Sequence, residues 1–400
     1  MILRTRLFLE KTCEQYGSTA QSILTAALAA IVVSVSAYSI WRTGFSLHHD
    51  EWVGRGLYPG LAMGYGLDLY EPSTGPHVTL YGFGTALFYA PAALAANPAQ
   101  AIWFAYLLNV IGFAIPVAYL LNRVLSAAIP DPPKRYSAVF GSILLILAIF
   151  SVEPTTEGIL RIHADLPALF FLLGGLCLFD LHLRKNDNLF LYLTAVSLSM
   201  SVWAKLPTLT AASFPILYFL LEREFKKAAL FIPILGTSFF LTFAPFALFY
   251  DWDDTVFVLF KHISGGTWSI RNHLFDGENA TFLKMSYFEA IPLMFRFLVM
   301  YLAEYWYLAL TALASLAIFL KNTSSKSDHI LKNTPLIYGL TLPPGLAALA
   351  HFGSVENSLL FANASGLLLL FSLLRFPVGF SIFGSDIFEL TLPPELLSKK

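Results

Sequence analysis

Long blocks of apolar residues, separated by short polar segments, make up most of this sequence. A transmembrane helix needs about 20 such residues, and a shorter block can still cross where the bilayer thins locally. The pattern therefore predicts an all-α fold, a polytopic transmembrane helical bundle of about ten spans. The blocks that we assign to spans are 23–41, 101–121, 137–152, 166–181, 189–203, 206–221, 228–250, 291–320, 336–350 and 359–374.

Composition places the chain among integral membrane proteins. Of its 400 residues, 56% are hydrophobic and 13% are charged, whereas soluble domains carry about 25% charged residues. The formal net charge of −1 and the scattered basic residues give no sign of a nucleic-acid partner. The two cysteines, Cys13 and Cys177, provide neither a disulfide framework nor a cysteine-based metal site.

The segment 80–96, LYGFGTALFYAPAALAA, decides the sidedness of everything that follows it. If it does not cross the membrane, 17 of the 25 basic residues lie on the side of the N-terminus. Cytoplasmic loops carry an excess of Lys and Arg. We therefore predict that 80–96 is an interfacial or re-entrant helix, and that this multi-pass protein lies in a bacterial inner (plasma) membrane with its N-terminus in the cytoplasm.

This topology makes residues 1–375 one transmembrane module and residues 376–400 a short C-terminal tail. The outer side then holds three loops, at about 43–100, 153–165 and 251–290, with interfacial helices expected in the first. Binding and catalytic residues concentrate on loops that a rigid scaffold positions. We therefore look for function on the outer face.

Two histidines and two acids, HHDE at 48–51, follow the first apolar block. Acids at the end of a span often only mark the membrane boundary. Here, however, an amphipathic stretch rich in Trp, Tyr and Gly continues the chain and keeps Asp50 and Glu51 near the headgroup layer, where the pKa of a carboxylate can rise toward that of a useful base. A metal site is the minor alternative, because His48 and His49 point in different directions on a strand or a helix.

A second polar group precedes the block at 166–181. Arg161, His163 and Asp165 are spaced two apart, and Lys205 stands beside Pro207 between two short blocks, again on the predicted outer side. An i,i+4 ion pair of Arg161 with Asp165 and a snorkelling Lys205 are the alternatives without function. Ionisable groups at membrane depth are costly unless they are paired or functional. Taken together, these residues predict an outward-facing site whose carboxylates deprotonate a hydroxyl and whose cations hold a phosphate.

The order of these features resembles the GT-C superfamily of polytopic glycosyltransferases, which includes protein-mannosyltransferase-like and aminoarabinose-transferase-like enzymes. The resemblance rests on the acidic pair at 50–51 and on the stretches GLDLYEPSTGPHVTLYGFGTALFYAP, RIHADLPALFFLLGGLCLF, AKLPTL and HFGSVENSLL. It implies that Asp50 is the catalytic base, Glu51 its neighbour or substitute and Asp165 a second acid. It also implies a substrate-binding set, namely Arg161 and Lys205 on the phosphate side with His163, His77, Tyr81 and Asn357.

The resemblance implies an inverting hexosyl- or pentosyltransferase of the cell envelope. Such an enzyme moves a sugar from a polyprenyl phosphate to a hydroxyl of a lipid, glycan or protein acceptor on the outer face, and we expect no cofactor and no metal. The alternative is a multi-pass transporter or flippase, in which Arg161, Asp165 and Lys205 line a substrate path. Transporters are expected to show internal repeats, and we find no repeat in the sequence.

Overall fold

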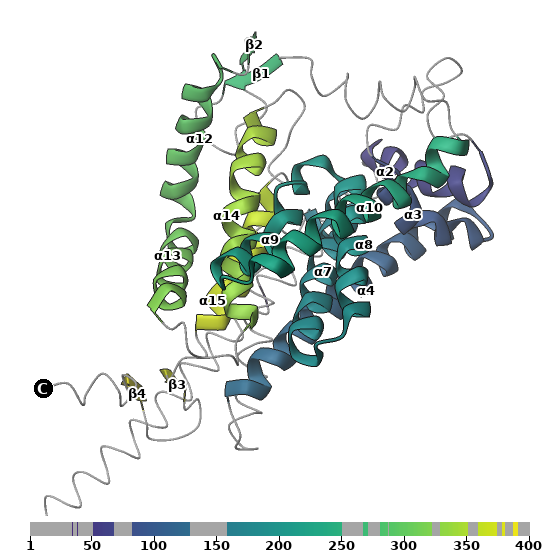
Figure 1. Ribbon diagram of the computed structural model, residues 1–400. Helices are drawn as coiled ribbons and strands as arrows, with labels where there is room; N and C mark the ends of the chain where they lie inside the picture. The colour runs from purple at the N-terminus through teal and green to yellow at the C-terminus, as the bar shows by residue number, and fades with distance from the viewer. Residues whose placement is uncertain are drawn as a thin grey trace, which may run out of the picture.

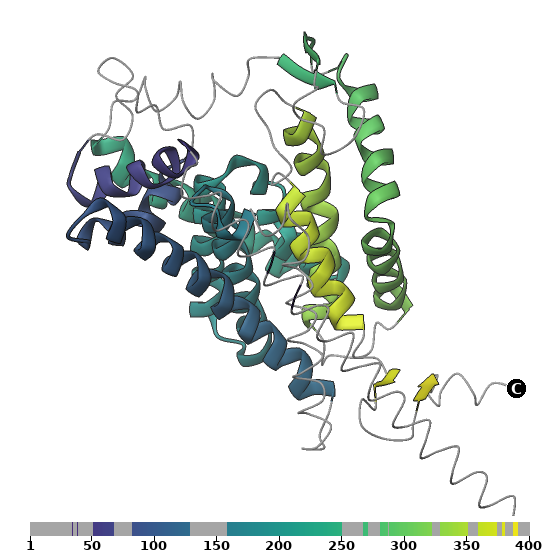
Figure 2. The same ribbon diagram turned by 180° about the vertical axis from the view of Figure 1, so that it is seen from behind.

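The computed structural model describes residues 34, 38, 51–67, 82–128, 158–249, 267–270, 281–286, 288–321, 329–350, 359–373, 378–380 and 387–390. This part of the chain is mostly helical, as predicted (Figure 1). One group of helices lies together, comprising α4 (Pro98–Ala128), α7 (Asp165–Lys185), α8 (Asn188–Ala204), α9 (Phe214–Leu221) and α10 (Phe225–Phe249). A second group lies beside it (Figure 2), comprising α12 (Ile291–Glu304), α13 (Trp306–Lys321), α14 (His329–Ala350) and α15 (Leu360–Leu373).

Three of the described helices are long and apolar enough to cross a membrane, namely Pro98–Leu120, Asp165–Lys185 and Phe225–Ala247. A fourth span arises if the bent pair of α12 and α13 is counted as one. The predicted spans at 137–152 and, apart from Ser34 and Tyr38, at 23–41 lie outside the described residues. The arrangement of about ten spans therefore stays a prediction.

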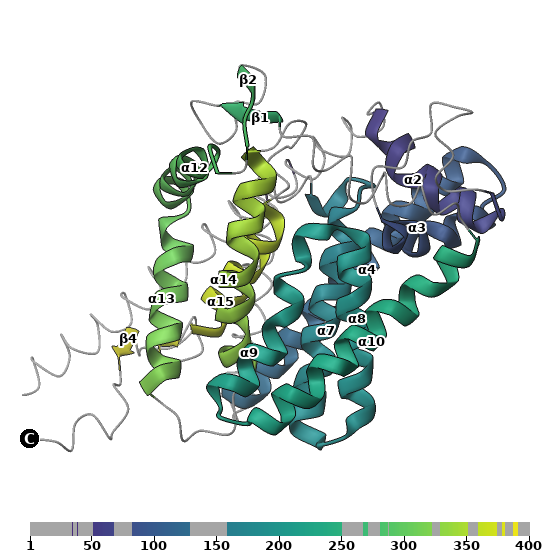
Figure 3. The ribbon, with the colours of Figure 1, turned by 45° about the horizontal axis from the view of Figure 1, so that its top comes forward.

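The block at 291–320 was predicted as one span, and the structure divides it into two helices. The helix breaks at Tyr305, and the axes of α12 and α13 differ by 89° (Figure 3). Tyr301 and Tyr305 lie at the bend, and both are buried in a cluster with side chains of α14 and α15. The Tyr301 hydroxyl donates to Asn363 Oδ1 at 3.1 Å and accepts from the Tyr338 hydroxyl at 3.2 Å.

Two small antiparallel sheets depart from the all-α prediction. Strands β1 (Thr267–Ile270) and β2 (Thr281–Lys284) pair within the predicted outer loop 251–290, and β3 (Val378–Phe380) pairs with β4 (Ile387–Leu390) in the tail. Residues such as Thr, Trp and Ile favour strands. Strands of three or four residues are too short to reveal themselves by alternation of apolar and polar positions.

The hairpin of α7 and α8 forms the centre of the first group. Asn186 ends α7 in the left-handed conformation, with φ 51°, and the Asp187 side chain caps α8 by accepting from the Leu189 N–H. Across the interface, Ser197 Oγ donates to the Phe171 carbonyl at 2.7 Å and Ser201 Oγ to the Ala168 carbonyl at 2.8 Å. Such hydroxyl-to-carbonyl bonds join helices where hydrophobic contacts alone do not distinguish protein from lipid.

A buried carboxylate in the C-terminal half of α7 bonds to side chains of α4. Asp180 accepts from the Tyr119 hydroxyl at 2.7 Å and from Arg123 Nε at 3.2 Å. Its side chain is 2% exposed. An ionised carboxylate at this depth needs such partners. We assign Asp180 a structural role, since its partners hold two long helices in register.

Three short helices lie at one end of the first group (Figure 1). They are α2 (Glu51–Gly64), α3 (Phe83–Tyr89) and the 3-10 helix η1 (Ala90–Leu94). The helical segment Phe83–Leu94 falls in the stretch 80–96 and is an apolar helix shorter than a span. At about 1.5 Å per residue in α3 and about 2.0 Å in η1 it covers roughly 20 Å, against about 30 Å of hydrocarbon. This length agrees with a segment that does not cross.

Cysteine labelling tests the predicted sidedness. In a chain whose Cys13 and Cys177 are replaced, Lys185→Cys should be protected from an impermeant maleimide added to intact cells, while Glu289→Cys should react. Both positions are exposed, so that accessibility of the side chain does not limit the reaction. Labelling of position 185 from outside would mean that 80–96 crosses, and the outer-site model would then be abandoned.

Candidate functional site

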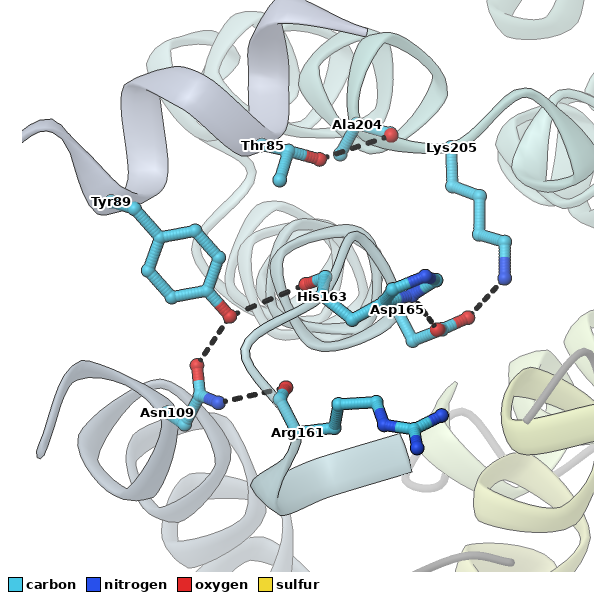
Figure 4. A network of polar contacts seen from close by, with 8 residues as sticks. All are labelled: Thr85, Tyr89, Asn109, Arg161, His163, Asp165, Ala204 and Lys205. Carbon is cyan, nitrogen blue, oxygen red and sulfur yellow. Dashed lines mark hydrogen bonds and ion pairs between the residues drawn. The ribbon is translucent and has the colours of Figure 1, made fainter. Parts of the chain in front are cut away.

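Residues of the predicted second outer loop and Lys205 meet around one buried carboxylate. Asp165 is the first residue of α7 and is 0% exposed. Lys205 Nζ donates to its Oδ1, and His163 Nδ1 bonds to its Oδ2 (Figure 4). Lys205 reaches Asp165 because α8 ends at Ala204 and the next residue is extended, with φ −152° and ψ 114°. The structure thus brings Asp165, His163 and Lys205 together.

The contact with Asp165 defines which nitrogen of His163 carries the proton. An ionised carboxylate only accepts hydrogen bonds, so Nδ1 carries the proton in the bond to Asp165. Burial lowers the pKa of His163, and the nearby charge of Asp165 opposes this shift, while Lys205 and Arg161 add to it. His163 is therefore neutral near pH 7, with the lone pair on Nε2.

Stability should depend on pH through His163. The unfolded chain binds a proton at this residue below about pH 6.5, whereas the folded chain resists it. The free energy of unfolding in detergent should therefore be insensitive to His163 above that pH and fall as the pH drops below it. His163→Gln should remove this part of the decline. If wild type and variant lose stability in parallel between pH 7.5 and 5.5, the assignment of a neutral His163 is wrong.

Two further side chains complete the group. In Figure 4 the guanidinium of Arg161 and the ammonium of Lys205 extend to the same side of the segment that leads into α7. Lys205 Nζ lies 5.9 Å from the centroid of the Phe361 ring on α15, a distance at which a cation is attracted to an aromatic face. The second group of helices thus borders the cation cluster formed by Arg161, His163, Asp165 and Lys205.

The backbone of this segment is held by residues that the sequence analysis missed. The Tyr89 hydroxyl shares its one proton between two acceptors, Asn109 Oδ1 at 2.7 Å and the His163 carbonyl at 3.2 Å. Asn109 Nδ2 in turn donates to the carbonyls of Leu160 and Arg161, both at 3.1 Å. A single Asn within the apolar block 101–121 was the available signal, since a buried amide needs partners.

The predicted first outer loop also touches this segment, through α2. Gly56 of α2 lies so close to the Ile162 carbonyl that no Cβ would fit, and a Cβ at Gly60 would likewise clash with Tyr89. Glycines spaced four apart form one face of a helix and permit such backbone contact. Glu51 is the first residue of α2, and the helix that it begins therefore packs against the loop that carries His163.

Several predicted site residues lie outside the described part of the chain. These are Asp50, His77, Tyr81 and Asn357, so their predicted roles are untested. For Glu51 the structure describes the backbone and not the side chain. Within the described residues, no three His, Cys, Asp or Glu side chains gather as ligands of a metal ion would.

Comparison of the chain with protein-family models, with curated proteins and with solved structures gives no match.

Proposed function

We propose that this chain is a membrane glycosyltransferase that moves a sugar, with inversion, from a polyprenyl phosphate to an acceptor hydroxyl on the outer face. One observation carries the proposal, namely that Lys205, paired with buried Asp165, and Arg161 border the first residue of an apolar helix of spanning length. The isoprenoid tail of such a donor lies in the hydrocarbon, which confines its phosphate to the same boundary depth. Lys205 retains donors for a phosphate, because an ammonium has three.

The charge of the cation cluster supports a donor with a single phosphate. Arg161 and Lys205 are positive, Asp165 is negative and His163 is neutral, so these four groups carry a net charge of about +1. A sugar linked to a polyprenyl monophosphate is a phosphodiester and carries one negative charge. When the bond between the sugar and the phosphate breaks, the departing phosphate gains negative charge, and fixed cations stabilise that change.

In the proposed reaction, Asp50 takes the proton of the acceptor hydroxyl. The hydroxyl oxygen forms a bond to the anomeric carbon from the face opposite to the phosphate, while the bond from that carbon to the phosphate oxygen breaks. The transition state resembles an oxocarbenium ion, as in glycoside hydrolysis. Polyprenyl phosphate leaves as an anion, so that no general acid is required.

Asp165 has an orienting role in this scheme. Both of its oxygens already accept, one from Lys205 and the other from His163. A carboxylate held in this way is a poor proton acceptor, because protonation would break a buried ion pair. We therefore propose that Asp165 positions Lys205 and does not transfer a proton, which differs from the catalytic role implied by the resemblance.

Loss of either cation should weaken donor binding. A hydrogen bond from a charged group contributes about 1.5–3 kcal/mol, so Arg161→Ala and Lys205→Ala should each raise the apparent KM for a polyprenyl-phosphate sugar by about 10-fold or more. Radiolabelled donor and membrane vesicles provide the assay. Lys227→Ala is the control, since it removes an exposed pair with Glu224. Equal effects of all three variants would place the phosphate elsewhere.

A transporter or flippase is the second candidate, and the break in helix direction at Tyr305 favours it. Broken helices line the substrate sites of many transporters. Proteoliposomes that contain a fluorescent polyprenyl-phosphate sugar separate the two functions. Movement of the intact donor between leaflets, without transfer of the sugar to an added acceptor, would support transport and contradict the transferase.

A further inference from the structure

Helix α3 presents two buried polar side chains on one face. Thr85 and Tyr89 are four residues apart, and each is 0% exposed. Residues with this spacing lie on the same side of a helix, one turn apart. They are also the polar side chains of an otherwise apolar helix, FGTALFY. Their hydrogen bonds therefore show which segments of the chain α3 is fixed to.

Thr85 bonds to the segment that carries Lys205. Its Oγ1 donates to the Ala204 carbonyl at 3.2 Å, and Ala204 is the last residue of α8. Carbonyls at the end of a helix lack intrahelical donors. Gly82 and Gly84 let the backbone of α3 approach Trp203 so closely that no Cβ would fit at either position. The start of α3 therefore packs directly against the end of α8, next to Lys205.

Tyr89 bonds to the segment that carries Arg161 and His163. Its hydroxyl donates to the His163 carbonyl and to Asn109, and Asn109 donates to the carbonyls of Leu160 and Arg161. Three carbonyls of this irregular segment are thus held by two side chains that are themselves fully buried. Figure 4 shows Thr85 next to Ala204, and Tyr89 with its hydroxyl toward Asn109 and the carbonyl of His163.

We infer that α3 is a brace that sets the spacing between the cation of Lys205 and the cation of Arg161. One turn of helix connects the two anchoring side chains, so neither cation-bearing segment shifts without breaking a bond to α3. This inference rests on the proposed function where it concerns donor binding. Thr85, Tyr89 and Asn109 are accordingly positioning residues for the phosphate of the donor, acting through Lys205 and Arg161.

Tyr89→Phe tests the brace, because it removes the hydroxyl and keeps the ring. With the full chain in lipid nanodiscs and polyprenyl phosphate as the probe, the affinity should fall about 10-fold. Tyr218→Phe is the matched control, since it removes a buried tyrosine bond of 2.8 Å to His329 on α14. If both variants lose the same affinity, the effect is one of general stability and the brace is rejected.

Two double-mutant cycles ask whether the brace acts through the cations. Added to Arg161→Ala, Tyr89→Phe should cause little further loss of affinity, and Thr85→Val should likewise add little to Lys205→Ala. Thr85→Ser, which keeps the hydroxyl, should restore the affinity that Thr85→Val loses. Additive losses in both cycles would show that α3 acts independently of Arg161 and Lys205, against the inference.

Hydrogen exchange separates a failed brace from a failed function. In Tyr89→Phe, amide exchange should quicken over residues 160–164 and stay unchanged in the second half of α7, whereas Tyr218→Phe should leave residues 160–164 unchanged. If wild type does not bind polyprenyl phosphate and Tyr89→Phe still speeds amide exchange over residues 160–164, the proposed function fails and the brace stands. Unchanged exchange over residues 160–164 would overturn the brace, whatever the probe does.

Discussion

Asp50→Asn should lower the turnover of lipid-linked sugar transfer by about 10²-fold or more, with little effect on folding. The change keeps the size of the side chain and removes the basicity that the proposed reaction requires. The acceptor oxygen must lie at the depth of the donor phosphate, and a base much further from the membrane could not reach its proton within hydrogen-bond distance. Radiolabelled donor in membrane vesicles measures the turnover, with expression and thermal midpoint as the checks on folding.

Glu51→Gln is the matched control for this prediction. It removes the neighbouring carboxylate at the start of α2 and should have the smaller effect if Asp50 is the base. A larger effect of Glu51→Gln would move the role of base by one residue. Added chelator should not alter the activity of His48→Ala or His49→Ala. Full activity in both carboxylate variants would reduce the acids to boundary markers and end the catalytic assignment.

Asp165→Ala should lower the free energy of unfolding by about 3–5 kcal/mol, because it leaves the ammonium of Lys205 buried without its partner. The side chain of Lys205 is 13% exposed, and that of Asp165 is 0% exposed. If one partner is removed, the remaining charge is therefore too buried for water to take the partner's place at low cost. Denaturant unfolding in detergent, followed by intrinsic tryptophan fluorescence, measures the change.

The double variant Asp165→Ala with Lys205→Met shows whether the loss arises from the pair. Removing both charges should restore most of the stability, since apolar side chains often replace a buried pair without cost. Glu224→Ala provides the exposed counterpart, because its pair with Lys227 is 39–46% exposed and such pairs contribute about 0–1 kcal/mol. Equal losses in Asp165→Ala and Glu224→Ala would contradict a buried, essential pair.

The helices were largely predictable, because long apolar blocks leave few alternatives to a helix. The blocks at 101–121, 166–181 and 189–203 reappear as α4, α7 and α8. The bend at Tyr305 was not predictable from the apolar block alone, and the side chains that pack around it belong to α14 and α15, which are distant in the sequence. Helix α14 begins at His329 and contains three prolines, which helices packed against other helices tolerate.

The charged residues of the site were predictable from the sequence. The uncharged residues that hold their backbone in place were not. Ionisable residues near apolar blocks stand out, so Arg161, His163, Asp165 and Lys205 could be named from the sequence. Thr85 and Tyr89 could not, because one Thr and one Tyr in an apolar helix are unremarkable until their partners are known. The glycines of α2 were visible, yet their four-residue spacing gains meaning only from the carbonyl that Gly56 approaches.

The hairpin of α7 and α8 also bears on how the chain enters a membrane during synthesis. Helix α8 has 17 residues, or roughly 26 Å, which is shorter than the hydrocarbon layer. Only two residues, Asn186 and Asp187, separate it from α7, so the second helix follows the first after a very short turn. The hydroxyls of Ser197 and Ser201 find their carbonyl partners on α7 at once. We expect α7 and α8 to insert into the membrane as a pair, because the contacts with the longer α7 stabilise the shorter α8 there.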